Sequence, residues 1–344
     1  MTVTVVRVGG SPSKRGRAVG RALAEQIHRS LDFYRGFLEP RSVRRADLPT
    51  LLTPYRRATE DAFPDLAEEL DGMAAGADAP PWEVFAANAW EELEPLLAMA
   101  PADRCTAFAV SGPDGTILAH NEQWYAGDDG GCAVVVAEPD DGPAFASPTG
   151  PAFLPVVGVN RNGLAQAVMS LSARDDGEGV PRVPVSSAGL RAADAADHLR
   201  RVTPPGRSGG YAYVVATPGA VGTVETSASR HARLESKAHT NHYLDPTLAQ
   251  DGSANDGSVA RLERLRTLLA EREPATVEAC MDVLRDHHSE PQSICMHPEP
   301  AAGDEAVGIT FSMVCRLEER RMWVAAGNPC TEPFEEIDVA EALR

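Results

Sequence analysis

The feature that most constrains the fold of this chain is a change of hydrophobic period at Cys105. Before it, apolar residues recur every three or four positions, as between Val19 and Leu38, which predicts amphipathic helices. After it, short β-prone runs alternate with turn residues, which predicts strands. We therefore expect a helix-rich segment, residues 1–104, and a sheet-rich segment, residues 105–344, which together form one domain.

The order of the predicted elements indicates the fold class. Strands are expected over residues 106–111, 116–121, 133–137, 155–160, 164–171, 211–216, 221–226, 308–317 and 322–326. Pro113-Asp114-Gly115 is the expected turn between the first two. Two helices, from near Ser258 and from Thr276, fall between the strands at residue 226 and residue 308. Strands, then helices, then strands favour antiparallel sheets covered by helices, an α+β fold, over repeated βαβ units.

Composition limits the partners. The formal net charge of −18 over 344 residues argues against nucleic acid and anionic membranes, which both favour clusters of Lys and Arg. No apolar run approaches the roughly 20 residues of a membrane span. The N-terminus has neither a basic leader nor a long apolar region, so we expect a cytoplasmic protein. A small-molecule substrate is the expected partner, and a homo-oligomer is compatible with the sequence.

The metal-capable residues do not form a recognisable motif. None of the six cysteines belongs to a Cys-x-x-Cys pair, so neither a disulfide framework nor a zinc site is predicted. Histidines occur in two groups, and their spacing gives no consistent set of ligands. These candidates are His239, His242, His287 and His288, with Cys295 and His297 nearby. We predict no metal and no bound cofactor.

Other short motifs match a known functional pattern only in part, because the residues around them differ from those that the pattern requires. Gly206-Arg207-Ser208-Gly209-Gly210 matches the nucleophile elbow of serine hydrolases, but that elbow needs a strand before it and a helix after it. Here prolines precede the serine and a strand follows. Ser11-Pro12-Ser13-Lys14 is a bare pattern at a helix start. The loop from Asp251 to Gly257 lacks the glycine and glutamate of a calcium loop.

Cys105 is the strongest candidate nucleophile. A cysteine at the start of a strand, straight after a polar loop, can attack the preceding carbonyl, here that of Arg104, and water can open the resulting thioester. The freed α-amine would have a pKa of about 7.7–8.0 and could act as general base for the thiol. Such a site needs an oxyanion donor, and Asn121 and Asn241 are the available amides.

The sequence resembles the acyl-coenzyme A:6-aminopenicillanate acyltransferase (isopenicillin N acyltransferase) family of self-cleaving N-terminal-nucleophile (Ntn) hydrolases. The resemblance rests on an ordered set of stretches. These are residues 63–77 and 84–93, Cys105-Thr106-Ala107-Phe108, residues 115–124, residues 240–245 and residues 323–330.

The resemblance implies a four-layer αββα sandwich of two antiparallel sheets flanked by helices. It also implies cleavage between Arg104 and Cys105, with a small chain, residues 1–104, that stays bound to the large one. By position, Cys105 is the nucleophile, Asn241 the oxyanion donor, and Asn121 orients the amine or helps hold the loop. Two residues depart from the family pattern. Arg104 stands where glycine is usual, and Gln123 stands where aspartate is expected.

The leading interpretation is a self-processing amidase or acyltransferase that forms a Cys105 thioester with a small amide or thioester substrate. The sequence is also compatible with a coenzyme A thioester as acyl donor. The phosphates of that donor would need a basic groove, and the available basic residues are Arg161, Arg174, Arg182 and Lys237. The main alternative is an unprocessed, non-catalytic protein of the same fold that binds a ligand or partner. A third alternative is an uncleaved thiol hydrolase that pairs Cys105 with His120 or His242.

Overall fold

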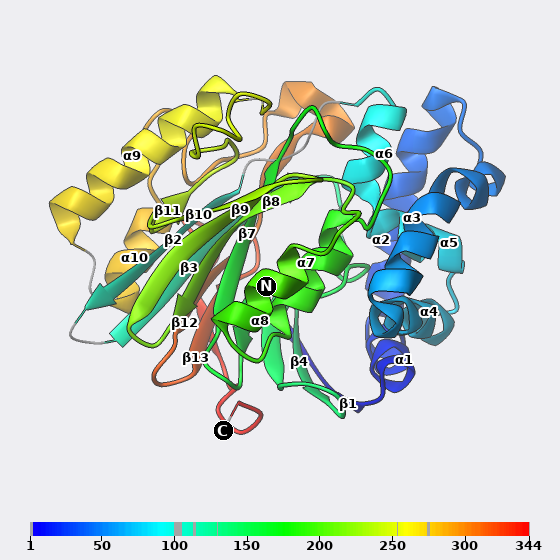
Figure 1. Ribbon diagram of the computed structural model, residues 1–344, viewed down its shortest axis with the longest axis horizontal. Helices are drawn as coiled ribbons and strands as arrows, with labels where there is room; N and C mark the ends of the chain where they lie inside the picture. Colours follow the sequence, from blue (N-terminus) through cyan, green and yellow to red (C-terminus); the bar gives the residue numbers. More distant parts are fainter. Residues whose placement is uncertain are drawn as a thin grey trace.

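The computed structural model describes residues 3–99, 105–112, 115–128, 130–252, 254–273 and 276–343. Two β-sheets pack face to face and helices cover both outer faces (Figure 1). The four-layer αββα sandwich expected from the sequence is thereby confirmed. Arg104 and the turn residues Pro113 and Asp114 lie outside the described residues.

The larger sheet has eight strands in the order β1-β4-β5-β6-β7-β8-β9-β10. It is antiparallel except at one edge, where β1 runs parallel to β4. Its strands are β1 (Thr4–Gly10), β4 (Ala133–Pro139), β5 (Phe145–Thr149), β6 (Gly158–Asn160), β7 (Ala165–Leu171), β8 (Gly210–Thr217), β9 (Ala220–Thr226) and β10 (His231–Leu234).

The smaller sheet has six strands in the order β11-β2-β3-β12-β13-β14. β2 and β3 form a hairpin, with Gly112 paired to Gly115 next to the turn. β12 pairs with the other edge of β3. The strands are β2 (Thr106–Gly112), β3 (Gly115–Tyr125), β11 (Ala238–His239), β12 (Val307–Arg316), β13 (Arg321–Ala325) and β14 (Glu335–Ile337).

The helices divide between the two outer faces (Figure 1). Those of the first hundred residues, with α7 and α8, lie on the side of the larger sheet; α9 and α10 cover the smaller sheet. They are α1 (Pro12–Ala22), α2 (Ala24–Leu38), α3 (Leu48–Ala62), α4 (Pro64–Ala77), α5 (Pro81–Ala87), α6 (Trp90–Leu96), α7 (Arg182–Leu190), α8 (Ala195–Val202), α9 (Asp256–Arg272) and α10 (Val277–Leu284), with 3-10 turns at Glu39–Arg41, Arg45–Asp47 and Pro300–Glu305.

Three apolar clusters fill the three interfaces between the layers. The alternation of side chains along a strand distributes residues between them. In β4, Val135 and Ala137 pack against the helices, whereas Val134 and Val136 pack between the sheets. In β2, Ala107 faces the other sheet and Phe108 faces α9 and α10. The side of a strand on which a residue lies therefore determines its environment.

The sequence predicts a helix-rich segment before Cys105, and the structure adds a β-strand to it. β1 is an edge strand of the larger sheet, paired with β4 over seven residues from Thr4↔Ala133 to Gly10↔Pro139. Its burial alternates, with Val6 and Val8 buried and their neighbours exposed. The run is short and ends in two glycines, so its own residues do not reveal a strand. A strand of the N-terminal segment is thus built into the sheet of the C-terminal one.

Two buried ion pairs also join the two segments. Glu69 of α4 accepts hydrogen bonds from Arg15 of α1 and from Arg191, which follows α7, at 2.8 Å each. Glu92 of α6 accepts from the guanidinium of Arg182 at 2.8 Å. All five side chains are less than a tenth exposed. The helical segment is therefore held to the rest of the molecule by buried charges as well as by apolar packing.

Replacing Glu69 with alanine is expected to destabilise the protein by about 3–5 kcal/mol, because Arg191 loses its carboxylate partner and Arg15 keeps only Asp141. Urea denaturation of the Glu69→Ala variant measures this loss. The matched control is Glu68→Ala, since Glu68 is the exposed neighbour on the same helix. Equal midpoints for the two variants would contradict the predicted role of the ion pair.

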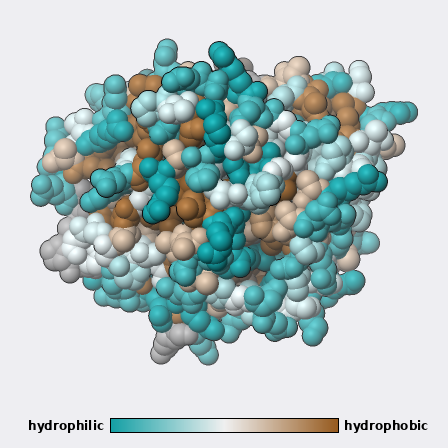
Figure 2. Space-filling model, viewed as in Figure 1, coloured by the Kyte–Doolittle hydropathy of each residue, from teal (hydrophilic) through white to brown (hydrophobic). Residues whose placement is uncertain are grey.

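One face of the molecule can be followed in Figure 2. On the face shown in Figure 2, hydrophilic side chains predominate and apolar ones form smaller areas between them. Within the described ranges, no helix is both long and apolar enough to cross a bilayer.

Candidate active site

Cys105 lies immediately before β2 and its side chain is buried, with 5% of the residue exposed. The β2–β3 register pairs Thr106 with Asn121, so Cys105 is opposite Glu122. The thiol lies 3.4 Å from a Glu122 carboxylate oxygen, and the other oxygen lies 2.9 Å from His120 Nε2. The three groups are within 4.8 Å of one another. This thiol, carboxylate and imidazole form the only such cluster that includes Cys105 in the described part of the chain.

The surroundings of Cys105 keep its thiol protonated in the uncut chain. Burial raises its pKa well above the usual value, and the Glu122 carboxylate raises it further. A hydrogen bond with the backbone of Gln123 acts in the opposite direction and is outweighed. A base is therefore needed for nucleophilic attack, and Glu122 is in contact with the proton to be removed.

Asn121 and Gln123 lie on the opposite face of β3 from Cys105. Their amide groups donate to the backbone oxygen of Ile294, at 3.0 and 3.1 Å. Asn121 also donates to Leu284 O and accepts from the Ser312 hydroxyl. Successive side chains alternate across a strand, so residues 121 and 123 face α10 whereas 120 and 122 face the thiol. The structure does not bring these two amides to Cys105.

Asn241 lies near Cys105, on the other side of β2 from Glu122. β11 pairs Ala238 with Phe108 and His239 with Ala107; carried two residues further, this register places Asn241 beside Cys105. The Asn241 amide donates to the backbone oxygen of Ser170 at 3.2 Å. Its oxygen accepts from Arg261 at 3.0 Å. Its orientation is therefore fixed, and one of its two amide hydrogens is left for a ligand.

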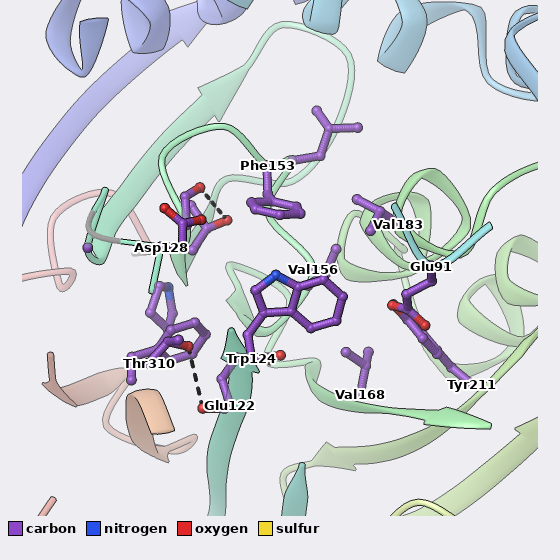
Figure 3. A pocket seen from close by; sticks show the side chains of 16 residues that line it. Glu91, Glu122, Trp124, Asp128, Phe153, Val156, Val168, Val183, Tyr211 and Thr310 are labelled. Atoms are coloured by element: carbon purple, nitrogen blue, oxygen red, sulfur yellow. Dashed lines mark hydrogen bonds between the residues drawn. The ribbon is translucent and has the colours of Figure 1, made fainter. Parts of the chain in front are cut away.

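A mostly apolar cavity of about 90 Å³ adjoins Glu122 (Figure 3). Trp124 projects into it beneath Phe153. Glu122 lies at one end, whereas Glu91 and Tyr211 lie at the other. The remaining apolar lining comes from Leu154, Val156, Val168, Val183 and Phe311. The site thus offers a mostly apolar compartment whose acidic lining residues are Glu122, Asp128 and Glu91.

Glu91, from the N-terminal segment, sits in a polar network at the far end of the cavity. Its carboxylate accepts from the hydroxyls of Ser170 and Tyr211, and Arg182 lies 3.7 Å away. Burial raises the pKa of Glu91 to about 7; Arg182 opposes this shift and Glu92 adds to it. Because Ser170 O also accepts from Asn241, the network connects Glu91 with the surroundings of Cys105.

The shifted pKa of Glu91 predicts a pH dependence of stability. The folded state retains the Glu91 proton up to about pH 7, whereas the unfolded state releases it near 4.5. The contribution to stability is therefore complete below pH 4.5 and is lost as pH rises through 7. Between pH 5 and 8, wild-type protein should lose about 2–3 kcal/mol more than Glu91→Gln. Urea denaturation at both pH values measures this, and parallel losses would contradict it.

The other sequence candidates have structural partners elsewhere. Ser208 is buried and donates to Glu92 and to Val180 O. His239 pairs with Glu225, and His242 lies 2.8 Å from the Ser258 hydroxyl. Burial lowers the pKa of His242 to about 4. Of the two histidines considered as partners of Cys105, only His120 lies in its cluster. Sequence reasoning missed Glu91 because it lies in the segment regarded as packing alone.

Comparison with known proteins identifies the family. The family model "Acyl-coenzyme A:6-aminopenicillanic acid acyl-transferase" matches residues 110–331, more than half of the chain. The chain belongs to this family. The family predicted from its sequence motifs is thereby confirmed. The match begins just after Cys105, so the assignment does not depend on that residue.

Individual relatives of this acyltransferase family member are distant. The 40 kDa form of acyl-coenzyme A:6-aminopenicillanic-acid-acyltransferase from Emericella nidulans is 27% identical over 117 residues, 34% of this chain and 32% of that protein. The match therefore spans about a third of the relative's length.

Solved structures are also similar. Penicillin V acylase from Agrobacterium tumefaciens has a TM-score of 0.49 at 16% identity, covering 70% of this chain and 88% of that one. A Caenorhabditis elegans N-acylethanolamine-hydrolyzing acid amidase ortholog has a TM-score of 0.42 at 12% identity, covering 70% and 97%.

Proposed function

We propose that this protein cuts its own backbone before Cys105 and then uses the freed cysteine to hydrolyse or transfer the acyl group of a small amide. The observation that carries the proposal is the contact of 3.4 Å between the Cys105 thiol and the Glu122 carboxylate, next to an apolar cavity. A buried thiol paired with a carboxylate at the start of a strand has the two groups that the first step needs.

Self-cleavage begins when Glu122 accepts the thiol proton. The Cys105 sulfur attacks the Arg104 carbonyl carbon, the C–N bond breaks, and the nitrogen takes a proton to become the α-amine of Cys105. Water then opens the thioester, which gives an Arg104 carboxylate and restores the thiol. His120 holds the Glu122 carboxylate in place through its contact at 2.9 Å. The ion pairs of Glu69 and Glu92 would keep residues 1–104 bound to the large chain.

Turnover repeats the same chemistry on a substrate. The α-amine takes the thiol proton, the thiolate attacks the acyl carbonyl, and an acyl thioester forms as the amine leaves with a proton. The spare Asn241 amide hydrogen and a backbone N–H stabilise the oxyanion. Water or a second amine then takes the acyl group. Glu122 supplies the negative charge that Gln123 lacks, and Asn121 and Gln123 hold the loop at Ile294.

The cavity supports a substrate with a compact apolar acyl group. About 90 Å³ suits a short acyl chain, since it is smaller than the roughly 150 Å³ of an apolar cavity that holds benzene. Arg182 is paired with Glu92 and Asp176, and Arg161 donates to Ala342 O. These two cations are therefore engaged within the protein, which favours an N-acyl amide over a coenzyme A thioester.

A second candidate is an uncleaved thiol hydrolase that uses His120. The observation that favours it is the position of His120, whose imidazole nitrogen lies within 4.8 Å of the Cys105 sulfur. In that mechanism His120 and Glu122 would activate the thiol of the intact chain.

The denatured intact mass of freshly purified protein distinguishes these functions. Two fragments, the larger beginning at Cys105, would support self-cleavage. One full-length mass that persists on long incubation, with turnover of N-acyl p-nitroanilides, would favour the uncleaved hydrolase. One full-length mass without turnover would leave the binding protein.

A further inference from the structure

Four metal-capable side chains from two loops meet on the side of the smaller sheet away from Cys105. His287, Cys295 and His297 lie in the loop after α10, and Cys330 lies between β13 and β14. Their ligand atoms are all within 4.8 Å of one another. The same loop carries Ile294, which accepts the hydrogen bonds from β3 on the face opposite the thiol.

The distances approach those of a tetrahedral zinc site. His287 Nε2 and His297 Nε2 are 3.1 Å apart, and Cys330 Sγ is 3.3 Å from His297 Nε2. Zn–N bonds of about 2.05 Å and Zn–S bonds of about 2.3 Å at tetrahedral angles give N···N and N···S separations of about 3.3 and 3.6 Å. The two imidazole rings are stacked at 5.3 Å between centroids. Small shifts of these loop side chains would therefore form the coordination shell.

Hydrogen bonds hold the two loops together around the cluster. The Asn328 amide lies 3.7 Å from Cys295 Sγ and donates to Met296 O at 2.9 Å. The Arg285 guanidinium donates to Pro329 O at 3.0 Å, so the two loops are already joined. Two sulfurs and two imidazoles are soft or borderline ligands, which favour zinc over calcium or magnesium. Hydrogen bonds to ligating groups are what fix a metal site in its geometry.

We propose that His287, Cys295, His297 and Cys330 bind one Zn²⁺ ion as a closed, four-coordinate structural site. The two thiols lose their protons on binding, and both imidazoles bind in the neutral form through Nε2. With four protein ligands, no position is left for water or substrate, so the ion ties the loop after α10 to the loop after β13 and takes no part in acyl transfer. The site is independent of the proposed function.

Metal content of the reduced full-length protein tests this site. Protein freed of metal with a chelator and incubated with one equivalent of ZnCl₂ should retain one zinc per chain after gel filtration. Cys330→Ser and His297→Ala should each reduce the retained zinc at least tenfold. Cys132→Ser and His288→Ala are the matched controls, since each removes a similar group outside the cluster, and both should retain the full equivalent.

A second readout separates zinc binding from loss of folding. Co²⁺ in place of zinc should give the sulfur-to-cobalt charge-transfer and visible d–d bands of a tetrahedral thiolate site, and Cys330→Ser should lose part of the charge-transfer intensity. Equal zinc in all five proteins, or none in the reduced wild type, would overturn the proposal. So would a Cys295–Cys330 disulfide that persists under reducing conditions in folded protein.

Discussion

Cys105→Ala protein is expected to remain a single polypeptide of 344 residues and to lose acyl turnover by about 10³-fold or more. Alanine removes the sulfur needed both for the attack on the Arg104 carbonyl and for the acyl thioester. Intact mass and an N-acyl p-nitroanilide assay measure the two losses on one sample. The Cys132→Ser protein is the control, because Cys132 is a partly buried cysteine outside the thiol–carboxylate cluster.

The serine variant refines this expectation. Cys105→Ser keeps a nucleophilic atom at the same place, so its processing should be slower than that of wild type and faster than that of the alanine variant. Fragments that begin at residue 105 in the alanine variant would mean that another protease makes the cut. That result would remove self-cleavage from the mechanism and leave the thioester step to be tested by turnover alone.

Glu122→Gln is expected to slow self-cleavage by about 10²–10³-fold, because glutamine keeps the hydrogen bond to the thiol and cannot accept its proton. The time course of fragment formation after purification measures this rate. Gln123→Ala is the matched control on the neighbouring position. It loses the hydrogen bond to Ile294 O, so it should cost about 1–2 kcal/mol in urea denaturation and change the cleavage rate less than about threefold.

The two variants also test which face of β3 carries the chemistry. Normal cleavage in Glu122→Gln together with slow cleavage in folded Gln123→Ala would assign the chemistry to the face of β3 that carries Gln123. Slow cleavage in Glu122→Gln alone would identify the residue beside the thiol as the base.

Glu122, and not Gln123, lies opposite Cys105 because of the register of the β2–β3 hairpin. The sequence indicates a hairpin and an alternation of faces, but the register of a hairpin depends on the length of its turn. A three-residue turn at Pro113-Asp114-Gly115 would place residue 123 opposite Cys105. The structure pairs Gly112 with Gly115, which moves the register by one residue and places Glu122 there. One residue of turn length decides which side chain meets the thiol.

Features dictated by local periodicity could be predicted, and those that depend on distant contacts could not. The strands on both sides of residue 160 and helices α9 and α10 follow directly from their patterns. β1 could not be predicted from its own residues, because its strand character depends on pairing with β4, far along the chain. The same holds for the metal-capable cluster. Cys330 lies 33 positions after His297, with two strands between them, so no local spacing reveals that their side chains meet.

The strand that residues 1–104 contribute to the larger sheet changes the thermodynamics of the processed protein. Once the bond before Cys105 is cut, complete unfolding releases two polypeptides. The unfolding equilibrium is then between one folded complex and two separate unfolded chains. Dilution then favours the unfolded side, although every contact of the native state is unchanged. Refolding requires an encounter between two molecules, one of which must supply the edge strand β1 and the carboxylate partners of Arg182 and Arg191. Folding would thus have to come first and cutting second, which makes biosynthesis of the mature enzyme a one-way sequence of events.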